Sequence, residues 1–344
     1  MISHFSERLR LWSLVLCASL AAGCGRPSTP AGAADSKVSG AKPLLKVGFQ
    51  LDWYPSPEHG GIFEALAKGY YRDAGLDVTI APGGPGSFPL PIVGTGRMEI
   101  AMGRADDVMI AVQQGLPLLI VGAQMQHDPQ AIMVHDDGPV KTFKDLEGRS
   151  VMSGPGAHWV GYVQKHYGVN FNVIPTDYGV GRFMSDKGFI QQCFITNEPF
   201  FVEQQGIKTR ALLIAGDGYD PYRVIFTNRK FAESHPEALR AFMAATIRGY
   251  TEYLNGDSRP ARQRIQAENP SQTDPIFDYG IAAMKRYRLV EGDPAKGERM
   301  GFITPERMTE LQKTLVELKL LDAPMPLDRF VRFDFLPPPA ALGK

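Results

Sequence analysis

Apolar residues in the first third of the chain follow two spacings in turn, one typical of strands and one typical of helices. Residues 45–49 alternate weakly between apolar and polar side chains and predict a first strand. Apolar side chains then recur every three or four positions across 60–75, which predicts a helix that Gly75 is placed to end. The same alternation continues with strands over 76–80, 98–102, 118–124 and 131–134 and helices over 87–95 and 106–115. Strands that alternate with helices predict a mostly parallel α/β sheet with both faces covered.

A second unit with the same alternation begins near residue 143. We predict a strand, a helix and a later strand at 150–152, 157–167 and 188–195. After an apolar strand over 222–226 the pattern becomes largely helical, and Ser-His-Pro-Glu at 234–237 predicts a capping box at a helix start. The chain therefore contains two α/β units followed by a helical last third.

The N-terminal segment has the pattern of an export signal. Two arginines, Arg8 and Arg10, precede an apolar run over 11–22, which is shorter than the roughly 20 residues that span a bilayer. The run closes as Leu-Ala-Ala-Gly-Cys at 20–24, which resembles the lipobox of bacterial lipoproteins. We therefore expect a signal peptide over 1–23, a lipid-anchored tether over 24–44 that begins at an acylated Cys24, and a body outside the cytoplasmic membrane. A plain signal peptide that happens to contain Cys24 is the alternative.

Composition and charge limit the classes of protein to which this chain can belong. A chain of 344 residues is long enough for about two domains, and 44% hydrophobic with 22% charged residues is the composition of a globular protein. The 37 basic side chains balance 37 acidic ones, which excludes the basic excess of a nucleic-acid binder. Three cysteines make no disulfide framework, and no Cys/His cluster has the spacing of metal ligands.

Four short motifs carry a resemblance to one family of solute-binding proteins. They are Leu-Asp-Trp-Tyr-Pro-Ser-Pro-Glu-His at 51–59, Ala-Lys-Gly-Tyr-Tyr with Ala-Gly-Leu-Asp-Val across 67–78, Ile-Thr-Asn-Glu-Pro at 195–199 and Phe-Ala-Glu-Ser-His-Pro-Glu at 231–237. Together they resemble the family that contains the thiamine-pyrimidine-binding proteins of ABC importers and the fungal thiamine pyrimidine synthases. The similarity covers residues 45–260 and, more loosely, the chain up to 335.

The resemblance implies a two-lobe periplasmic-binding-protein fold of type II, in which two α/β lobes joined by two hinge crossings close on a ligand. We expect the crossings near 135–139 and 220–223. Lobe 1 then comprises 45–136 and 222–335, lobe 2 comprises 137–221, and residues 336–344 form a tail. The resemblance also implies an ABC permease and ATPase as partners, and we expect a monomer.

Ligands of open α/β sheets bind outside the carboxyl ends of the strands, which here are the segments 52–59, 83–87, 103–107, 153–159 and 197–198. Trp53 and Tyr54 in the first segment and Trp159 in the fourth suit stacking on a flat heterocycle. Trp53 or Tyr54 plugging the edge of the lobe is the alternative. The candidate ligand-binding residues are Asp52, Trp53, Tyr54, His59, Ser87, Asp106, Asp107, His158, Trp159, Asn197 and Glu198.

Two carboxylates are expected to face each other across the cleft, Asp52 from one lobe and Glu198 from the other. A carboxylate engages the ring nitrogen and exocyclic amine of an aminopyrimidine with two hydrogen bonds. Glu198 is the stronger candidate, between Asn197 and Pro199 at a strand end, with a salt bridge or helix cap as its structural alternative. An N-cap explains one of the adjacent Asp106 and Asp107.

The enzyme function of the family is not expected here. In the fungal synthases a lysine that binds pyridoxal phosphate and a histidine four residues later fall, by this resemblance, at Gly103 and Asp107. Glycine cannot form a Schiff base and aspartate cannot supply an imidazole, so we expect no cofactor, no metal and no catalysis. His59 lies in a different loop, and the histidine's role is not transferred to it.

The ligand remains open between several chemistries that the superfamily transports. Sulfonates and nitrate require basic side chains, whereas the candidate loops contain four acidic residues against Arg104 alone. This balance favours a neutral or cationic, amine-bearing ring such as a thiamine pyrimidine precursor. Riboflavin stays possible because the aromatic residues stack on any flat ring, and so does a sensor that acts without a transporter.

Overall fold

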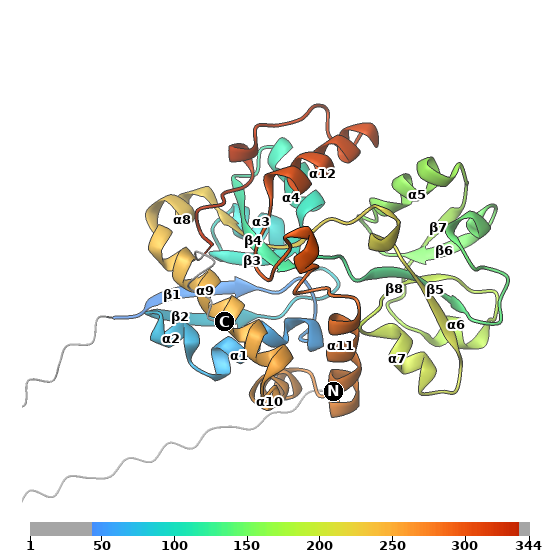
Figure 1. Ribbon diagram of the computed structural model, residues 1–344, viewed down its shortest axis with the longest axis horizontal. Coiled ribbons are helices and arrows are strands. Elements are labelled where there is room, and N and C mark those ends of the chain that lie inside the picture. The colour runs from blue at the N-terminus through green and yellow to red at the C-terminus, as the bar shows by residue number, and fades with distance from the viewer. Residues whose placement is uncertain (1–42, 337–344) are drawn as a thin grey trace, which may run out of the picture. The chain divides into compact units, whose positions relative to one another are not determined.

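The computed structural model describes residues 43–336, in which ten strands form two five-stranded sheets (Figure 1). The expected signal peptide, Cys24 and almost all of the tail lie outside these residues. In the first sheet the order is β2-β1-β3-β10-β4, with β1 (Leu45–Gln50), β2 (Leu76–Ala81), β3 (Ile100–Arg104), β4 (Leu118–Met125) and β10 (Arg223–Asn228). In the second it is β7-β6-β8-β5-β9, with β5 (Gln130–His135), β6 (Ser150–Ser153), β7 (Asn172–Pro175), β8 (Gln191–Phe194) and β9 (Thr209–Leu213).

Each sheet contains one strand that runs against its neighbours. β1 pairs in parallel with β2 and β3, whereas β10 is antiparallel to β3 and β4. In the second sheet β6 is parallel to β7 and β8, and β5 is antiparallel to β8 and β9. Both antiparallel strands are the first strands formed after the chain changes sheets. The two sheets confirm the predicted α/β class.

The first crossing lies earlier than the expected 135–139. The chain leaves β4 at Met125 and enters the second sheet at Gln130, so residues 126–129 form the crossing. The sequence analysis placed the apolar strand 131–134 in lobe 1, because a fully buried strand reads the same in either sheet. The chain returns through 214–222 to β10. By sheet membership, lobe 1 contains 45–125 and 223–336, and lobe 2 contains 130–213.

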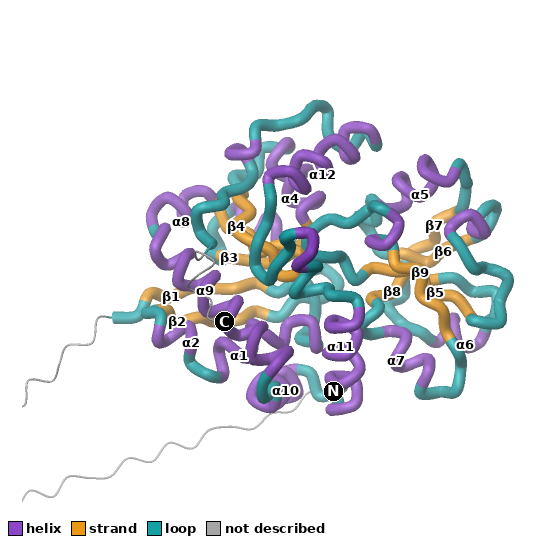
Figure 2. Tube along the Cα trace, in the orientation of Figure 1, coloured by secondary structure: helices purple, strands orange, loops and turns teal. Residues whose placement is uncertain are grey.

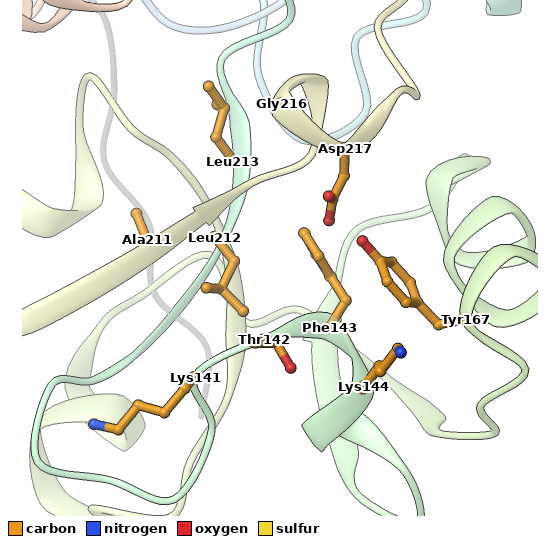
Figure 3. Close-up of a pocket in the computed structure, with 10 residues that line it drawn as sticks. All are labelled: Lys141, Thr142, Phe143, Lys144, Tyr167, Ala211, Leu212, Leu213, Gly216 and Asp217. Atoms are coloured by element: carbon orange, nitrogen blue, oxygen red, sulfur yellow. The ribbon is translucent and has the colours of Figure 1, made fainter.

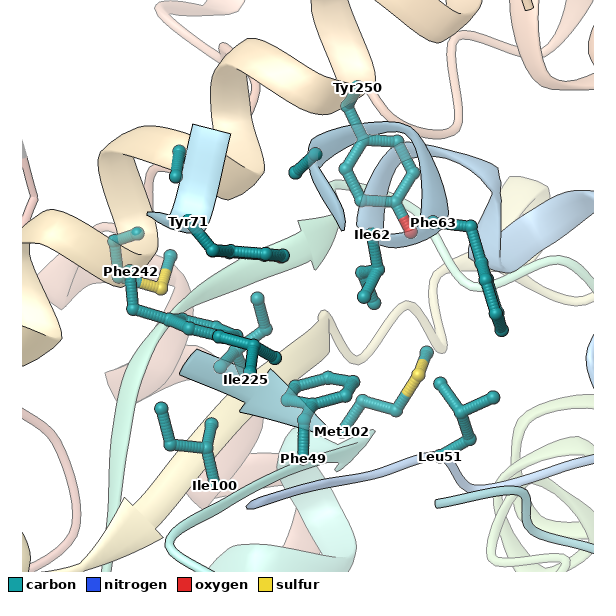
Figure 4. Close-up of a cluster of buried hydrophobic side chains, with 14 of the residues drawn as sticks. Phe49, Leu51, Ile62, Phe63, Tyr71, Ile100, Met102, Ile225, Phe242 and Tyr250 are labelled. Atoms are coloured by element: carbon teal, nitrogen blue, oxygen red, sulfur yellow. The ribbon is translucent and has the colours of Figure 1, made fainter. Parts of the chain in front are cut away.

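Lobe 1 buries both faces of its sheet under helices from distant parts of the chain (Figures 1 and 2). On one face Phe49 of β1 stacks on Phe242, which in turn stacks on Tyr71, at ring-centroid distances of 5.5 and 5.0 Å (Figure 4). That face carries α1 (Gly60–Ala67), α2 (Tyr70–Asp73), α8 (Arg229–Ser234), α9 (Pro236–Asn255), α10 (Arg259–Glu268) and α11 (Asp274–Arg286). The opposite face carries α3 (Pro89–Gly94), α4 (Ala105–Gln113) and α12 (Pro305–Glu317). The helices of the last third therefore pack on the sheet of lobe 1 and do not form a separate hydrophobic core.

Lobe 2 is smaller, with α5 (Trp159–Tyr167) over one face of its sheet and α6 (Gly181–Ser185) and α7 (Glu198–Glu203) over the other. Short 3-10 turns connect the elements: η1 (Pro57–His59), η2 (Phe143–Leu146), η3 (Ala215–Asp217), η4 (Pro294–Lys296) and η5 (Leu327–Arg329). Within 43–336, none of the helices combines the length and apolar character that crossing a membrane requires.

Candidate ligand-binding cleft

A cavity of about 530 Å³ lies between the two lobes. Its lobe 1 wall contains segments that follow β1 and β2, the end of β3 and residues of β10. Its lobe 2 wall contains segments that follow β6, β7 and β8, together with residues of β5 and β8 themselves. Parallel strands present their carboxyl ends at one edge of a sheet, and in each lobe this edge faces the other lobe. The fold thus places the predicted loops around one cavity.

The structure brings about half of the predicted residues to this cavity. The lining includes Asp52, Trp53, Ser87, Asp107, Asn197 and Glu198. Tyr54, His59, Asp106, His158 and Trp159 do not line it. Trp159 is 1% exposed and stacks on Phe171 in the core of lobe 2 at 6.2 Å, so it is a packing residue. Its place at the start of a helix did not reveal that the ring points away from the cleft.

Asp52 is committed to partners within its own lobe. Arg223, the first residue of β10, donates to one carboxylate oxygen, and His59 lies 3.3 Å from the other. The His59 ring is neutral, because its Nδ1 accepts from the backbone N–H of Ser56 at 3.1 Å and its Nε2 then donates to Asp52. Burial lowers the pKa of His59 to about 4, which keeps the ring neutral near pH 7. The hydrogen bonds of this neutral ring to Ser56 and Asp52 hold the first loop in place. Arg223 also lines the cavity, and the sequence analysis did not identify it.

Arg104 at the end of β3 organises a second charged group. Its Nε lies 3.2 Å from a carboxylate oxygen of both Asp106 and Asp107, and its guanidinium also donates to the carbonyl of Gly156 in lobe 2. Asp106 is fully buried and accepts from the Tyr219 hydroxyl at 2.7 Å. Burial raises the pKa of Asp106, whereas at Asp107 Arg104 and His158 together outweigh burial and lower the pKa of that carboxyl. The two neighbouring aspartates therefore have different surroundings, and only Asp107 faces the cavity.

His158 joins the lobes through this group. Its Nε2 donates to Asp107 at 3.0 Å, so the side chain from lobe 2 does reach toward the cleft as expected, but its partner is a protein carboxylate. Asp106, Asp107 and His158 each offer a ligand atom within 4.8 Å of the others. The guanidinium of Arg104 already lies against both carboxylates, which leaves this group poorly suited to a cation.

Glu58 of lobe 1 and Glu198 of lobe 2 both line the cavity, and burial and the charge of Glu58 both raise the pKa of Glu198. Glu58 of lobe 1 accepts from the Thr196 hydroxyl of lobe 2, and Glu198, the first residue of α7, accepts from the backbone N–H of Phe194 at 2.7 Å. Burial raises the pKa of both, that of Glu198 to about 7, and the charge of Glu58 adds to the effect. Glu58 takes the place expected of Asp52. Glu58 lies inside the 51–59 motif, and this position could have identified it as a candidate from the sequence.

Aromatic side chains cover the mouth of the cavity. Trp53 of lobe 1 packs against Tyr178 of lobe 2 with ring centroids 5.2 Å apart, and the edge of Tyr54 meets Trp53 at 5.6 Å. Tyr54 and Tyr178 are about half exposed. The contact between Trp53 and Tyr178 joins the two lobes, so it forms only when the cleft is closed.

Three amide side chains of the cavity wall contain an oxygen with no partner in the described part of the chain. These atoms are Oε1 of Gln130, Oε1 of Gln191 and Oδ1 of Asn197. A buried acceptor left without a hydrogen bond costs about 1–3 kcal/mol. A ligand that carries N–H or O–H groups would offset this cost. Sequence reasoning identified Asn197 but not the glutamines, which appear as polar positions at the ends of otherwise apolar strands.

A second cavity, of about 570 Å³, lies on lobe 2 (Figure 3). It is lined by residues 141–144 and 211–213 with Tyr167, Gly216 and Asp217, and the Tyr167 hydroxyl points toward Asp217. Its lining residues, all described, come from lobe 2 and the return crossing. Closure between the lobes therefore does not enclose it, and we take the interlobe cavity as the candidate site.

A family model and several curated proteins match this chain. A family model described as NMT1/THI5 like matches residues 56–258, more than half of the chain. A 4-amino-5-hydroxymethyl-2-methylpyrimidine phosphate synthase of Saccharomyces cerevisiae is 23% identical over 62% of this chain and 68% of its own. The riboflavin-binding protein RibY of Chloroflexus aurantiacus is 23% identical over 96% of this chain and 97% of its own. A formylaminopyrimidine-binding protein of Halalkalibacterium halodurans is 25% identical over 60% and 66%.

Solved structures share the fold. The alkanesulfonate-binding protein SsuA of Xanthomonas axonopodis pv. citri superposes with a TM-score of 0.62 at 13% identity, covering 85% of this chain and all of that one. This likeness confirms the predicted two-lobe periplasmic-binding-protein fold.

Proposed function

Because this chain belongs to the NMT1/THI5-like family, we propose that it is an extracytoplasmic solute-binding protein that encloses a small, flat, amine-bearing ring. The observation that carries the proposal is the chemistry of the interlobe cavity. Its wall combines an aromatic ring, two carboxyls from opposite lobes and three amide oxygens without partners in the described chain. Such a wall accepts hydrogen bonds and suits a ligand that donates them.

A thiamine pyrimidine precursor fits this wall best. The carboxyl of Glu198 lies at the start of α7, partly open to the cavity, where it pairs with a ring nitrogen and an exocyclic amine. Because burial raises its pKa to about 7, the group is ready either to donate a proton to the ring nitrogen or to accept from a protonated ring. The formylaminopyrimidine-binding relative supports this class of ligand.

Riboflavin is the second candidate. The relative that aligns over nearly the whole of this chain is a riboflavin-binding protein, and a cavity of about 530 Å³ is within the usual range for drug-sized ligands. A flavin lacks the exocyclic amine but carries ring N–H and hydroxyl donors. The two candidates therefore differ in their dependence on Glu198.

An anionic ligand is less well supported. Arg104 and Arg223 both line the cavity, so the cleft contains more basic groups than the sequence analysis counted. Each is paired with carboxylates of its own lobe, Arg104 with Asp106 and Asp107 and Arg223 with Asp52. A sulfonate or nitrate would have to compete with these pairs.

The synthase activity of some relatives also receives no support from the cavity. Pyridoxal phosphate needs a lysine for its Schiff base, and none of the described residues that line the cavity is a lysine. Gly103 lies in the wall, and a Cβ there would meet the ring of Phe226 at 3.2 Å. Asp107, at the expected histidine position, is bonded to Arg104 and His158. The residues present do not fit the cofactor.

Delivery to an ABC permease and ATPase completes the proposal. The body would be held at the outer side of a bacterial membrane through acylated Cys24 and the tether over 24–44. The fold supports this function, because closure of two lobes is how such proteins enclose and present ligands.

A ligand screen of the mature protein tests the proposal. We expect aminopyrimidines or flavins, but not alkylsulfonates or nitrate, to raise the melting temperature, since a ligand at 100 times its Kd stabilises by about 2.7 kcal/mol. Titration calorimetry then ranks the hits. Stabilisation by sulfonate or nitrate alone would contradict the proposed ligand class, and turnover with pyridoxal phosphate would contradict the binding function.

A further inference from the structure

Gln191 is a buried polar residue in the cavity wall whose orientation is determined. It is the first residue of β8, is 2% exposed and lines the cavity. Its Nε2 donates to the carbonyl of Gly179 at 3.3 Å. A carbonyl oxygen can only accept, so the amide nitrogen must face Gly179, and Oε1 is the atom left without a partner among the described residues.

The bond to Gly179 connects Gln191 to the loop at the mouth of the cavity, which we call the mouth loop (residues 176–180). Tyr178 in this loop has a φ of +60°, which is uncommon for a residue other than glycine. Its N–H donates to the Thr176 hydroxyl at 2.9 Å, and the N–H of Gly179 donates to Asp177 at 3.0 Å. These bonds hold the ring of Tyr178 against Trp53 of the other lobe.

The neighbouring Gln192 already has hydrogen-bond partners for its oxygen. Its Oε1 accepts from the Ser153 hydroxyl at 2.7 Å and from the N–H of Gly154 at 3.2 Å. Its acceptor therefore supports the β6 end of the cavity. Gln191 differs because one end of its amide is anchored and the other end, in a wall residue of the cavity, is unpaired.

We propose that Gln191 accepts a hydrogen bond from a hydroxyl or amino group on a substituent of the bound ring, and that through Gly179 it couples this recognition to closure of the mouth loop. The inference rests on the proposed function and extends it to a second position of the ligand, away from the edge held by Glu198. The preferred ligand is then a flat ring with a short donor-bearing side group.

A matched pair of probes tests this role. We compare 4-amino-5-hydroxymethyl-2-methylpyrimidine with 4-amino-2,5-dimethylpyrimidine, which lacks the hydroxyl, by titration calorimetry. We expect wild type to bind the hydroxymethyl compound about tenfold more tightly, the usual effect of one hydrogen bond. In Gln191→Met this preference should fall to within about twofold, while the affinity for the dimethyl compound stays within about twofold of wild type.

The variant also has a readout that a purely structural role would not produce. Gln191→Met removes an unpaired buried acceptor, which is favourable, and the donor to the Gly179 carbonyl, which is unfavourable. The melting temperature of the ligand-free protein should therefore change little, whereas loss of a purely structural glutamine would lower it. Gln272→Met is the matched control, because Gln272 is buried and also has an unpaired Oε1 but does not line the cavity. Its ligand preference should equal that of wild type.

The outcomes separate the two proposals. If wild type binds neither pyrimidine nor riboflavin, the proposed function is wrong and the role of Gln191 with it. If wild type binds both pyrimidines equally, or if Gln191→Met weakens both equally, the ligand is in the cleft but Gln191 does not read its substituent. The comparison within wild type needs no variant, so equal binding of the two pyrimidines contradicts the role of Gln191 even if Gln191→Met does not fold.

Discussion

At the scale of residues, the charged side chains of the cleft differ in whether they are paired. The arginines are each neutralised by carboxylates of lobe 1. Glu58 and Glu198 form no ion pair with a basic side chain among the described residues. Burial raises the pKa of both carboxyls, and the charge of Glu58 raises that of Glu198 further. Two carboxyls with raised pKa values therefore line the same cavity as the aromatic ring of Trp53.

Two substitutions separate stacking from hydrogen bonding in this site. Trp53→Ala should weaken every flat ligand by about tenfold or more, since stacking contributes roughly 0.5–1.5 kcal/mol beyond area burial. Glu198→Gln keeps the shape but replaces an acceptor by a donor, and a charge-assisted bond is worth on the order of 1.5–3 kcal/mol. It should therefore weaken an aminopyrimidine much more than a flavin. Calorimetric titration of both variants with both ligands measures this, and equal losses in Glu198→Gln would show that the carboxyl is structural.

At the scale of elements, the first loop depends on the contact between α1 and α9. Gly61 on α1 faces Tyr250 of α9, and Gly249 of α9 lies against the backbone of Gly61, so neither position has room for a side chain. The Tyr250 hydroxyl donates to the carbonyl of Glu58 at 2.7 Å. Close approach of these two helices thus determines where the 51–59 loop lies.

Gly249→Ala should consequently destabilise the protein. The added methyl meets backbone rather than a movable side chain, and overpacking of this kind typically costs about 1–3 kcal/mol. Urea unfolding of the ligand-free protein measures the change. Gly181→Ala is the control, because Gly181 begins a helix with open space around it and should be neutral or slightly stabilised. Equal stabilities of the two variants would contradict the packing argument.

At the scale of the whole body, charged side chains tie the two hinge crossings together. His127 of the first crossing places Nδ1 2.6 Å from Asp220 of the return crossing and Nε2 3.0 Å from Glu298. Both contacts are hydrogen bonds only if the ring carries two protons. Arg307 of α12 bonds to Asp220 and Glu298 as well, at 3.1 and 3.2 Å, so two cations and two anions balance at the hinge.

Stability should depend on the protonation of His127. Burial opposes its charge, but Asp220 and Glu298 outweigh burial and Arg307, and the pKa of His127 is raised above 6.5. Its contribution is therefore complete below about pH 6.5 and is lost as pH rises through the raised value. The free energy of unfolding of His127→Gln should fall below wild type at pH 6 and approach it by pH 9. The exposed His166→Gln should show no such trend, and a difference independent of pH would contradict the charged ring.

Anchoring is a prediction for the part of the chain outside 43–336. Cys24→Ala should abolish acylation and leave soluble protein or uncut precursor, while Cys17→Ala, within the apolar run, should leave acylation intact. Metabolic labelling with a fatty acid and membrane fractionation distinguish these results. Soluble wild type that begins at residue 25 or later would contradict the lipoprotein prediction.

The sequence determined the elements and the loops of the cleft. Alternating and helical spacing are local properties, so the strands at 45–49 and 76–80 and the helix after Gly60 were predictable. The rule that ligands bind at the carboxyl ends of strands selected the segments that surround the cavity, and within them Trp53, Asn197 and Glu198.

Only the tertiary structure decided which side chains of those loops face inward and which sheet each buried strand joins. Trp159 and Glu58 occupy similar loop positions in the sequence, yet the first is in the core of lobe 2 and the second lines the cavity. Arg223 of β10, Gln191 of β8 and Tyr178 of the mouth loop reach the site from three separate elements, and β5 belongs to lobe 2 although its apolar sequence fits either sheet. Spacing records the periodicity of one element, whereas the direction of a side chain depends on neighbours brought together by the packing of both lobes.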